Sequence, residues 1–326
     1  MSQHPLKLTA GGFFDIMQVA DVHYGEAEAL VWGPAQDINS TRVLRHVLRS
    51  EAPQLVAFTG DQLTGNNIHS NATRYWSRVI QAADESGVPH LAAMGNHDDA
   101  PYEGAAVAGP RSTTTARQLM AFEASLSHSV SQLGPANITG ASNYFVPVMS
   151  ATTPRPALFL YVLDSGGGQS TPEGVAADQV AWFASTAASN LARWGAVPSL
   201  LFVHIPTPEF ALARSRAANR CFGMNENGGV TPAPAPGLVD AAITAGVSAI
   251  IVGHDHGNDW ACPWAGAHGQ TWLVFGRHTG YGGYGSWARG SRMYRFNASS
   301  AHAGGCPWRT WVRMENGSVT HDGALC

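Results

Sequence analysis

The chain has few charged side chains, no cluster of basic residues and no long apolar run. Charged residues make up 13% of its 326 residues, and the formal net charge is −4. Because lysine and arginine never occur in a run, the sequence gives no sign of a nucleic-acid partner or of an electrostatic membrane contact. No apolar segment reaches the roughly 18 residues of a membrane span. With 44% hydrophobic residues available for a core, the composition predicts a soluble globular protein.

Cysteine is scarce as well, and its spacing excludes a cysteine-based zinc site. The four cysteines all lie in the last third of the chain, at Cys221, Cys262, Cys306 and Cys326. An even number in loop-rich sequence predicts two disulfides instead, and the sequence leaves all three pairings open.

The first eight residues lack the apolar stretch of a secretory signal peptide. Asn-x-Ser/Thr sequences are nonetheless more frequent than the about one or two that chance gives to a chain of this size. They favour a secreted, extracellular or vacuolar glycoprotein whose signal has been removed. A cytoplasmic protein in which these residues are simply common in turns is the alternative. The predicted glycosylation sites are Asn39, Asn71, Asn137, Asn297 and Asn316.

Short apolar runs alternate with amphipathic helical patterns along the chain, which predicts an α/β crossover fold. No linker or repeat interrupts the pattern, so we expect one domain over 1–326, built as a two-sheet β-sandwich flanked by helices. Beyond Trp260, short strands at 271–275, 293–296 and 310–314 are expected to complete the second sheet. Earlier strands are predicted at 13–20, 54–59, 88–94, 144–149, 157–163, 199–203 and 247–252, and helices at 39–50, 73–86, 115–126, 178–190 and 237–245.

Side chains that suit metal ions follow five of these strands. In an open α/β sheet, ligands bind outside the carboxyl ends of the strands. Imidazoles, carboxylates and an amide without thiolates suit two borderline or hard cations held side by side. About four ligands per ion result if one carboxylate is shared. The predicted metal ligands are Asp21, His23, Asp61, Asn96, His204, His254 and His256.

The order of these motifs, Asp-x-His, Gly-Asp, Gly-Asn-His-Asp, His and Gly-His-x-His, resembles that of the calcineurin-like metallophosphoesterases. The resemblance extends from about Phe14 to Phe296. The segments 204–210, 253–259 and 275–285 are similar to the short, single-domain, purple-acid-phosphatase-like branch of plants and fungi. The resemblance implies a four-layer αββα fold and a dinuclear metal centre.

Carried over residue by residue, the resemblance implies two metal positions with one shared ligand. It assigns the first ion to Asp21, His23 and His256. It assigns the second ion to Asn96, His204 and His254, with Asp61 bridging the two. True purple enzymes take a tyrosine ligand shortly after the Gly-Asp motif, but Gly60-Asp-Gln-Leu-Thr-Gly65 contains none. We therefore expect no tyrosinate colour, and the metals stay open among Fe, Zn and Mn.

Two such ions clamp a phosphoester and acidify a bridging water, so that hydroxide attacks without a protein nucleophile. No Gly-x-Ser-x-Gly elbow supplies a serine nucleophile. The resemblance implies that His97 is not a ligand and that it protonates or stabilises the leaving group, which suits an imidazole near neutral pH. Asp98 and Asp99 are expected to support the ligand loops.

The predicted function is hydrolysis of a small phosphorylated substrate, most simply a phosphomonoester, by a metal-bridging hydroxide. A phosphodiesterase acting on nucleotides or lipid headgroups is the alternative within the same chemistry. A non-catalytic, metal-binding glycoprotein is the alternative from another class. His278, Arg277 and Tyr281 in the Gly-rich segment 275–285 are predicted to line the substrate mouth, with a structural salt bridge as the other interpretation of Arg277. The sequence carries no indication of an oligomeric state.

Overall fold

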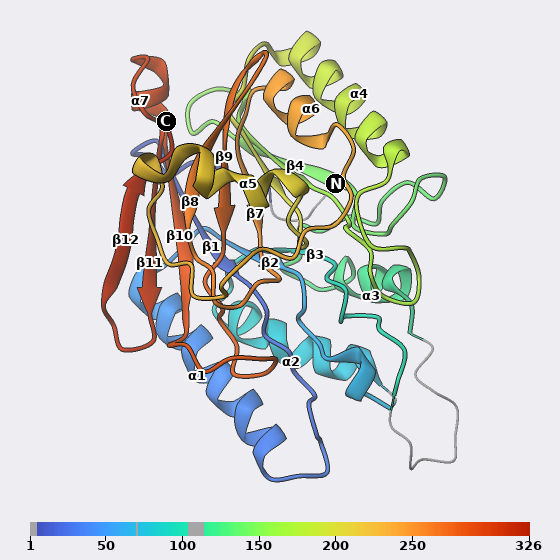
Figure 1. Cartoon of the computed structure of the whole chain (residues 1–326). Coiled ribbons are helices and arrows are strands. Elements are labelled where there is room, and N and C mark those ends of the chain that lie inside the picture. The colour runs from blue at the N-terminus through green and yellow to red at the C-terminus, as the bar shows by residue number, and fades with distance from the viewer. Residues whose placement is uncertain (1–4, 70, 104–113) are drawn as a thin grey trace.

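The computed structural model describes residues 5–69, 71–103 and 114–326. Two six-stranded mixed sheets pack face to face, and helices cover the outer face of each (Figure 1). The expected α/β sandwich of four layers is confirmed.

The first sheet joins the two ends of the chain, with the strand order β12-β11-β10-β1-β2-β3. Strands β1, β2 and β3 run parallel, whereas β10, β11 and β12 add to them in antiparallel fashion. The strands are β1 (Phe13–Val19), β2 (Leu55–Thr59), β3 (His90–Ala93), β10 (Gly290–Asn297), β11 (Trp308–Met314) and β12 (Val319–Ala324).

The second sheet has the strand order β4-β5-β6-β7-β9-β8. Its four central strands run parallel and an antiparallel strand closes each edge. The strands are β4 (Tyr144–Met149), β5 (Pro156–Val162), β6 (Ser199–Phe202), β7 (Val247–Val252), β8 (Ala261–Gly266) and β9 (Gly269–Phe275).

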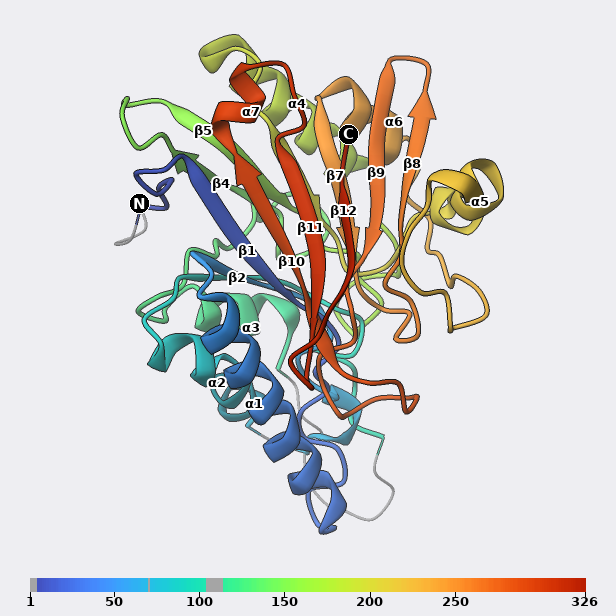
Figure 2. The same cartoon turned by 90° about the vertical axis from the view of Figure 1, so that its left-hand side faces the viewer.

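The helices divide between the two outer layers, as Figure 2 shows from the side. Helices α1 (Trp32–Glu51), α2 (Ala72–Glu85) and α3 (Ala116–Glu123) lie against the first sheet. Helices α4 (Ala177–Trp194), α5 (Pro208–Ala217) and α6 (Leu238–Thr244) lie against the second. Short helical turns are η1 (Gly65–Asn67), η2 (Ala218–Arg220) and α7 (Ala298–His302). Among the described helices, none is both long and apolar enough to cross a membrane.

Alternation along the strands explains why the second sheet is buried on both faces. In β5, Leu158, Leu160 and Val162 face the core between the sheets. Phe159 and Tyr161 face the core beneath α4 and α6. Successive side chains of a strand point to opposite faces, so an uninterrupted apolar run supplies both cores at once.

The tail of the chain differs from the sequence-based expectation. Only β8 and β9 complete the second sheet, whereas β10, β11 and β12 extend the first. Strand period alone does not say which sheet a strand joins, because both sheets need the same alternation. Helix α1 begins at Trp32, before the predicted start at Asn39, and α5, β8 and β12 were not predicted.

The disulfide prediction is confirmed, and the pairing is Cys221–Cys262 and Cys306–Cys326. The first disulfide ties the segment after α5 to β8. The second ties the C-terminal residue to the segment before β11. Both disulfides therefore hold peripheral segments onto the sheets.

The predicted glycosylation sites differ in their surroundings. Asn71, Asn137 and Asn316 are exposed, two of them in turns. Asn39 lies within α1 and is half-buried. The side chain of Asn297 caps α7 by accepting hydrogen bonds from two backbone N–H groups. Three of the five are thus freely accessible, and glycosylation stays a prediction.

Candidate metal centre

The predicted ligands follow the carboxyl ends of five strands, three in the first sheet and two in the second. The first ligand of each loop stands two or three residues after its strand: Asp21 after β1, Asp61 after β2, Asn96 after β3, His204 after β6 and His254 after β7. Because the parallel stretches of both sheets point the same way, these loops meet at one edge of the sandwich.

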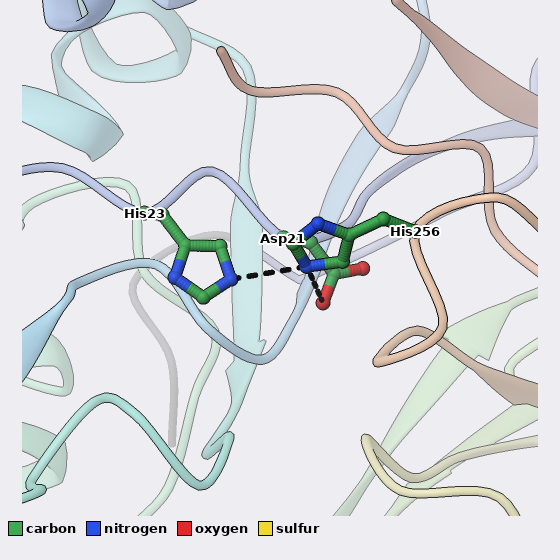
Figure 3. A group of neighbouring side chains, drawn as sticks. All are labelled: Asp21, His23 and His256. Atoms are coloured by element: carbon green, nitrogen blue, oxygen red, sulfur yellow. Dashed lines mark hydrogen bonds and ion pairs between the residues drawn. The ribbon is translucent and has the colours of Figure 1, made fainter. Parts of the chain in front are cut away.

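One group of side chains forms around Asp21, His23 and His256, all of them buried (Figure 3). Nε2 of His23 lies 3.2 Å from Nε2 of His256. Nε2 of His256 lies 3.7 Å from Oδ1 of Asp21. One atom from each residue can therefore reach a common cation, as expected for the first ion.

The second group forms around Asp61, His204 and His254. Oδ1 of Asn96 lies 3.1 Å from Nε2 of His204 and 3.1 Å from Nδ1 of His254, which adds an amide oxygen to the group. Oδ2 of Asp61 lies 3.2 Å from Nε2 of His204 and 3.6 Å from Nε2 of His23. Asp61 alone thus reaches both groups with one oxygen, as a bridging ligand must.

Hydrogen bonds on the far side of each ring fix which nitrogen faces the centre. Nδ1 of His204 donates to the carbonyl of Thr59 at 2.9 Å, and Nδ1 of His256 donates to the carbonyl of Tyr284 at 2.9 Å. Nδ1 of His23 lies 3.1 Å from the Thr64 hydroxyl. These contacts direct Nε2 of all three rings toward the centre, the arrangement that metal-ligating histidines show.

The backbone of the ligand loops adopts conformations that side chains rarely allow. Asp21, His23, Asp61 and His254 all have positive φ, between 52° and 76°. Such strain costs about 1–3 kcal/mol per residue and is found mainly at functional sites. Gly60 serves the same purpose, because a Cβ there would lie 2.2 Å from Nδ1 of His204. The chain gives up stability to bring these ligands together.

Burial keeps three of the histidines uncharged. It lowers the pKa of His23 to about 3, of His254 to about 4, and of His256 well below its usual range. Burial opposes charge on His204 too, but the neighbouring Asp61 carboxylate raises the pKa of His204 to about 10. The His204 charge in turn holds the pKa of Asp61 well below its ordinary value despite burial. Asp61 and His204 thus each favour the charged form of the other.

The donor set fits two cations. It offers four imidazole nitrogens, two carboxylates and one amide oxygen in two adjoining groups, with no thiolate. The hard and borderline donors suit Zn, Fe or Mn, and no feature of the geometry selects one of them.

His97 lies beside the centre without joining it. Its ring is half-buried and 5.1 Å from the ring of His23, centroid to centroid, and its backbone N–H donates to Oδ1 of Asp61 at 2.8 Å. Nearby, the buried Asp98 accepts hydrogen bonds from the N–H groups of Leu63 and Gly95 and so ties two ligand loops together. His97 therefore lies next to the first group of ligands, and Asp98 joins two of the loops that carry the ligands.

Two of the three residues predicted to line the substrate mouth are buried. Arg277 is buried in an ion pair with Asp259, because its guanidinium is needed to neutralise that carboxylate. His278 is fully buried behind His256. The hydroxyl of Tyr281 donates to Glu315 at 2.6 Å, away from the ligands. The ion pair supports the structural interpretation of Arg277, and burial contradicts the mouth prediction for Arg277 and His278, whereas the half-buried Tyr281 stays a prediction.

Tyr284, three residues further along the Gly-rich segment, contacts the centre instead. Its ring stacks on the ring of His256 at 4.0 Å with an angle of 12° between the planes. Tyr281 and Tyr284 each stand between two glycines, so no local signal in the sequence distinguishes them.

Two mixed sheets with helices outside carry paired groups of candidate metal-binding side chains at one edge, an arrangement suited to a dinuclear metal centre. Residues 14–258 match the family model of the calcineurin-like phosphoesterases, and the chain belongs to this family.

Curated relatives carry phosphatase names. "Probable inactive purple acid phosphatase 14" of Arabidopsis thaliana is 29% identical, over 95% of this chain and 83% of that protein. "Phosphatase DCR2" of Saccharomyces cerevisiae is 28% identical, over 96% of this chain and 55% of that protein. The predicted resemblance to the purple-acid-phosphatase-like branch is confirmed.

Solved structures share the fold. A dimetal phosphatase from Danio rerio has a TM-score of 0.54 at 13% identity, covering 96% of this chain and 98% of that one. Purple acid phosphatase PPD1 from yellow lupin, Lupinus luteus, has a TM-score of 0.58 at 14% identity, covering 99% of this chain and 55% of that one. At such identities the likeness shows the fold alone.

Proposed function

We propose that the protein is a two-metal phosphoester hydrolase that acts mainly on small phosphomonoesters. The observation that carries the proposal is the position of Asp61. One of its carboxylate oxygens, Oδ2, lies 3.2 Å from Nε2 of His204 in the second group and 3.6 Å from Nε2 of His23 in the first. Two bound cations supply Lewis acidity and an activated water for attack at phosphorus. The seven ligand side chains would hold these cations next to one another and leave coordination positions open for water and the substrate phosphate.

His97 is the residue of the chain that acts on the leaving group. Its half-buried ring stands next to His23, and its backbone is fixed by the bond to Asp61. From this position its imidazole donates a proton to the departing oxygen. The preference for monoesters rests on the phosphatase names of the relatives, and a phosphodiesterase uses the same centre.

A metal-binding glycoprotein without turnover is the competing function, and the name of the Arabidopsis relative favours it for that protein. The complete set of seven ligands together with His97 supports catalysis in this chain. A protein that had lost its activity but kept its metals would still have all the ligands. Only an activity assay therefore separates the catalytic function from the non-catalytic one.

The test uses the full chain, stripped with a chelator and reloaded with Fe, Zn or Mn, singly and in pairs. Hydrolysis of p-nitrophenyl phosphate and of bis(p-nitrophenyl) phosphate is measured together with bound metal. We expect metal-dependent turnover, faster on the monoester. Faster turnover of the bis ester would make the protein a phosphodiesterase. Two bound ions without turnover of either ester would establish the non-catalytic function.

We also propose that the protein is secreted or vacuolar, with a cytoplasmic location as the alternative. Two disulfides and five potential glycosylation sites support an oxidising compartment. A glycosidase that removes N-linked glycans should increase the gel mobility of the protein from its native source. Unchanged mobility together with free thiols would favour the cytoplasmic alternative.

A further inference from the structure

Tyr284 holds the ligand His256 by three separate contacts. The carbonyl of Tyr284 accepts from Nδ1 of His256 at 2.9 Å. Its hydroxyl accepts from the backbone N–H of His256 at 3.0 Å and donates to Asn227 at 2.7 Å. Its ring lies nearly parallel to the imidazole, 4.0 Å away. Ring, main chain and hydroxyl of one residue thus all act on one ligand.

A second ring contacts the same imidazole. His278 lies 3.9 Å from His256, with an angle of 37° between the ring planes. His278 is fully buried, and neither of its ring nitrogens has a hydrogen-bond partner in the described part of the chain. A buried polar group without partners is unfavourable. Packing against His256 is the contact that its ring does make.

The Gly-rich loop is shaped around this stack. Gly283 has φ of +71°, and a Cβ there would lie 2.3 Å from Cε1 of His256 and 2.9 Å from the ring of His23. Any side chain at this position would push the two ligand rings apart. The loop therefore runs directly against the ligands of the first ion and carries Tyr284 onto His256.

Within the residues that the structure describes, the other ligand rings have no stacked partner, and the His23 ring lies tilted 5.0 Å from the His256 ring. The His23 ring meets His97 edge-on at 5.1 Å, and the His204 ring meets His254 edge-on at 5.3 Å. Neither pair is stacked, and each pair consists of ligand rings or of a ligand ring and His97. The two flanking rings are a property of His256 and of the first ion.

We propose that Tyr284 and His278 are positioning residues that fix the plane of the His256 imidazole, and that Tyr284 thereby sets the affinity of the first metal ion. A ligand must be held within about 0.5 Å and 10–20° of its productive geometry. The stacked ring of Tyr284 and the tilted ring of His278 restrict rotation of the imidazole, while the Tyr284 carbonyl fixes its tautomer. The aromatic face of Tyr284 also stabilises the electron-poor imidazole of a cation-bound histidine.

This inference rests on the two-ion centre of the proposed function, but its test measures metal binding and not turnover. Chelator-stripped full chain is titrated with Zn²⁺ alone in a calorimeter, which resolves two binding steps. The variant His23→Ala identifies the step that belongs to the first ion. Tyr284 is 48% exposed, so its replacement should leave the fold intact.

The decisive variant is Tyr284→Leu, which removes ring and hydroxyl but keeps the carbonyl. We expect the first-ion step to weaken by about 10- to 100-fold, the usual effect of losing a partner of a metal ligand, with the second step unchanged. Tyr284→Phe keeps the ring and should stay within a few-fold of wild type in both steps. The matched control is Tyr161→Phe, whose hydroxyl accepts from Asn190 at 3.0 Å far from the centre.

Wild-type affinity in Tyr284→Leu would overturn the proposal, and so would equal weakening of both steps, which indicates general damage. If Tyr284→Phe weakened the first step as much as the Leu variant, the hydroxyl and not the stacked ring would be responsible, and the proposal would again fail. Should the Leu variant not fold, Tyr284→Met replaces it with the same expectation. Two normal zinc steps without hydrolysis of any ester would end the proposed function but leave this inference standing.

Discussion

Replacing Asp61 with asparagine should remove both metal ions from the centre, whereas the same change at Asp21 should remove one. Oδ2 of Asp61 is within 3.6 Å of ligand atoms in both groups. Oδ1 of Asp21 is 3.7 Å from Nε2 of His256 in the first group, and from the second group it accepts the backbone N–H of His254 at 3.0 Å rather than contacting a ligand atom. In Asp61→Asn, the one remaining oxygen is expected to keep the hydrogen bond from the His97 N–H, which directs the NH₂ group at both cations. An amide nitrogen has no lone pair to offer them.

The magnitude follows from the number of ligands lost. Asp61→Asn reduces the protein ligands of both ions, and Asp21→Asn reduces those of the first alone. If the two metal ions together stabilise the transition state by about 4 kcal/mol, losing both ions lowers kcat by roughly 10³-fold. Metal analysis after dialysis should give about two ions for wild type, about one for Asp21→Asn and about none for Asp61→Asn.

Metal content and kcat on p-nitrophenyl phosphate are measured on the same samples, with melting temperatures as a check on folding. The reasoning is refuted if Asp61→Asn and Asp21→Asn retain the same number of ions, since a shared ligand cannot then be assigned to Asp61. Retention of two ions by Asp61→Asn with lost turnover would also contradict it.

Three further outcomes are expected. His97→Ala should lower the rate of hydrolysis of an alkyl phosphate by about 100-fold or more but leave that of p-nitrophenyl phosphate nearly unchanged, because only a poor leaving group needs the proton. An equal decrease for both esters would contradict the role of His97 as proton donor. Glu123→Ala should destabilise the protein by about 3–5 kcal/mol in urea unfolding, since the buried carboxylate accepts from His90 at 2.9 Å and from three other donors. Burial raises the pKa of Glu123, but the interaction with His90 and the hydrogen bonds hold this pKa below 4.5. The stabilisation by the Glu123 carboxylate is therefore complete above pH 4.5 and is lost as the pH falls through the pKa of the folded state. A Glu123→Gln variant whose stability has the same dependence on acid pH would refute this pH dependence. Replacing Cys306 and Cys326 with serine should cost about 3 kcal/mol for a loop of 20 residues, and an unchanged urea midpoint would show the bond to be dispensable.

The sequence could predict that these candidate ligands lie close together because the first of each loop stands two or three residues after an apolar strand, and the assignment of the metal ions stays a prediction. Parallel strands end at one edge, so the positions of Asp21, Asp61 and His254 in the chain already imply that they meet. Strand length, crossover helices and the order of the motifs were recovered for the same reason. These features depend on local periodicity and on a topology that few alternatives can match.

The distribution of the last strands between the sheets could not be predicted in this way. β9 and β10 are both strands of seven or eight residues with mostly buried side chains, yet β9 joins the second sheet and β10 the first. Which sheet a strand joins depends on the strand it pairs with, β7 for β9 and β1 for β10, and this pairing is a property of the assembled sheets. Disulfide pairing has the same origin, since it requires the distance between segments and not their spacing in the chain.

The Gly-rich segment shows most clearly where local information ends. By itself the sequence determined the metal-binding chemistry, because the identity of a donor atom and its place after a strand are properties of a residue and its near neighbours. Only the tertiary structure decided that Tyr284 stacks on His256 while Tyr281 bonds to Glu315. Both tyrosines lie between glycines, and what separates them is the direction in which the folded loop turns each ring. Contacts between distant segments are fixed by packing, and packing exists only once both sheets are in place.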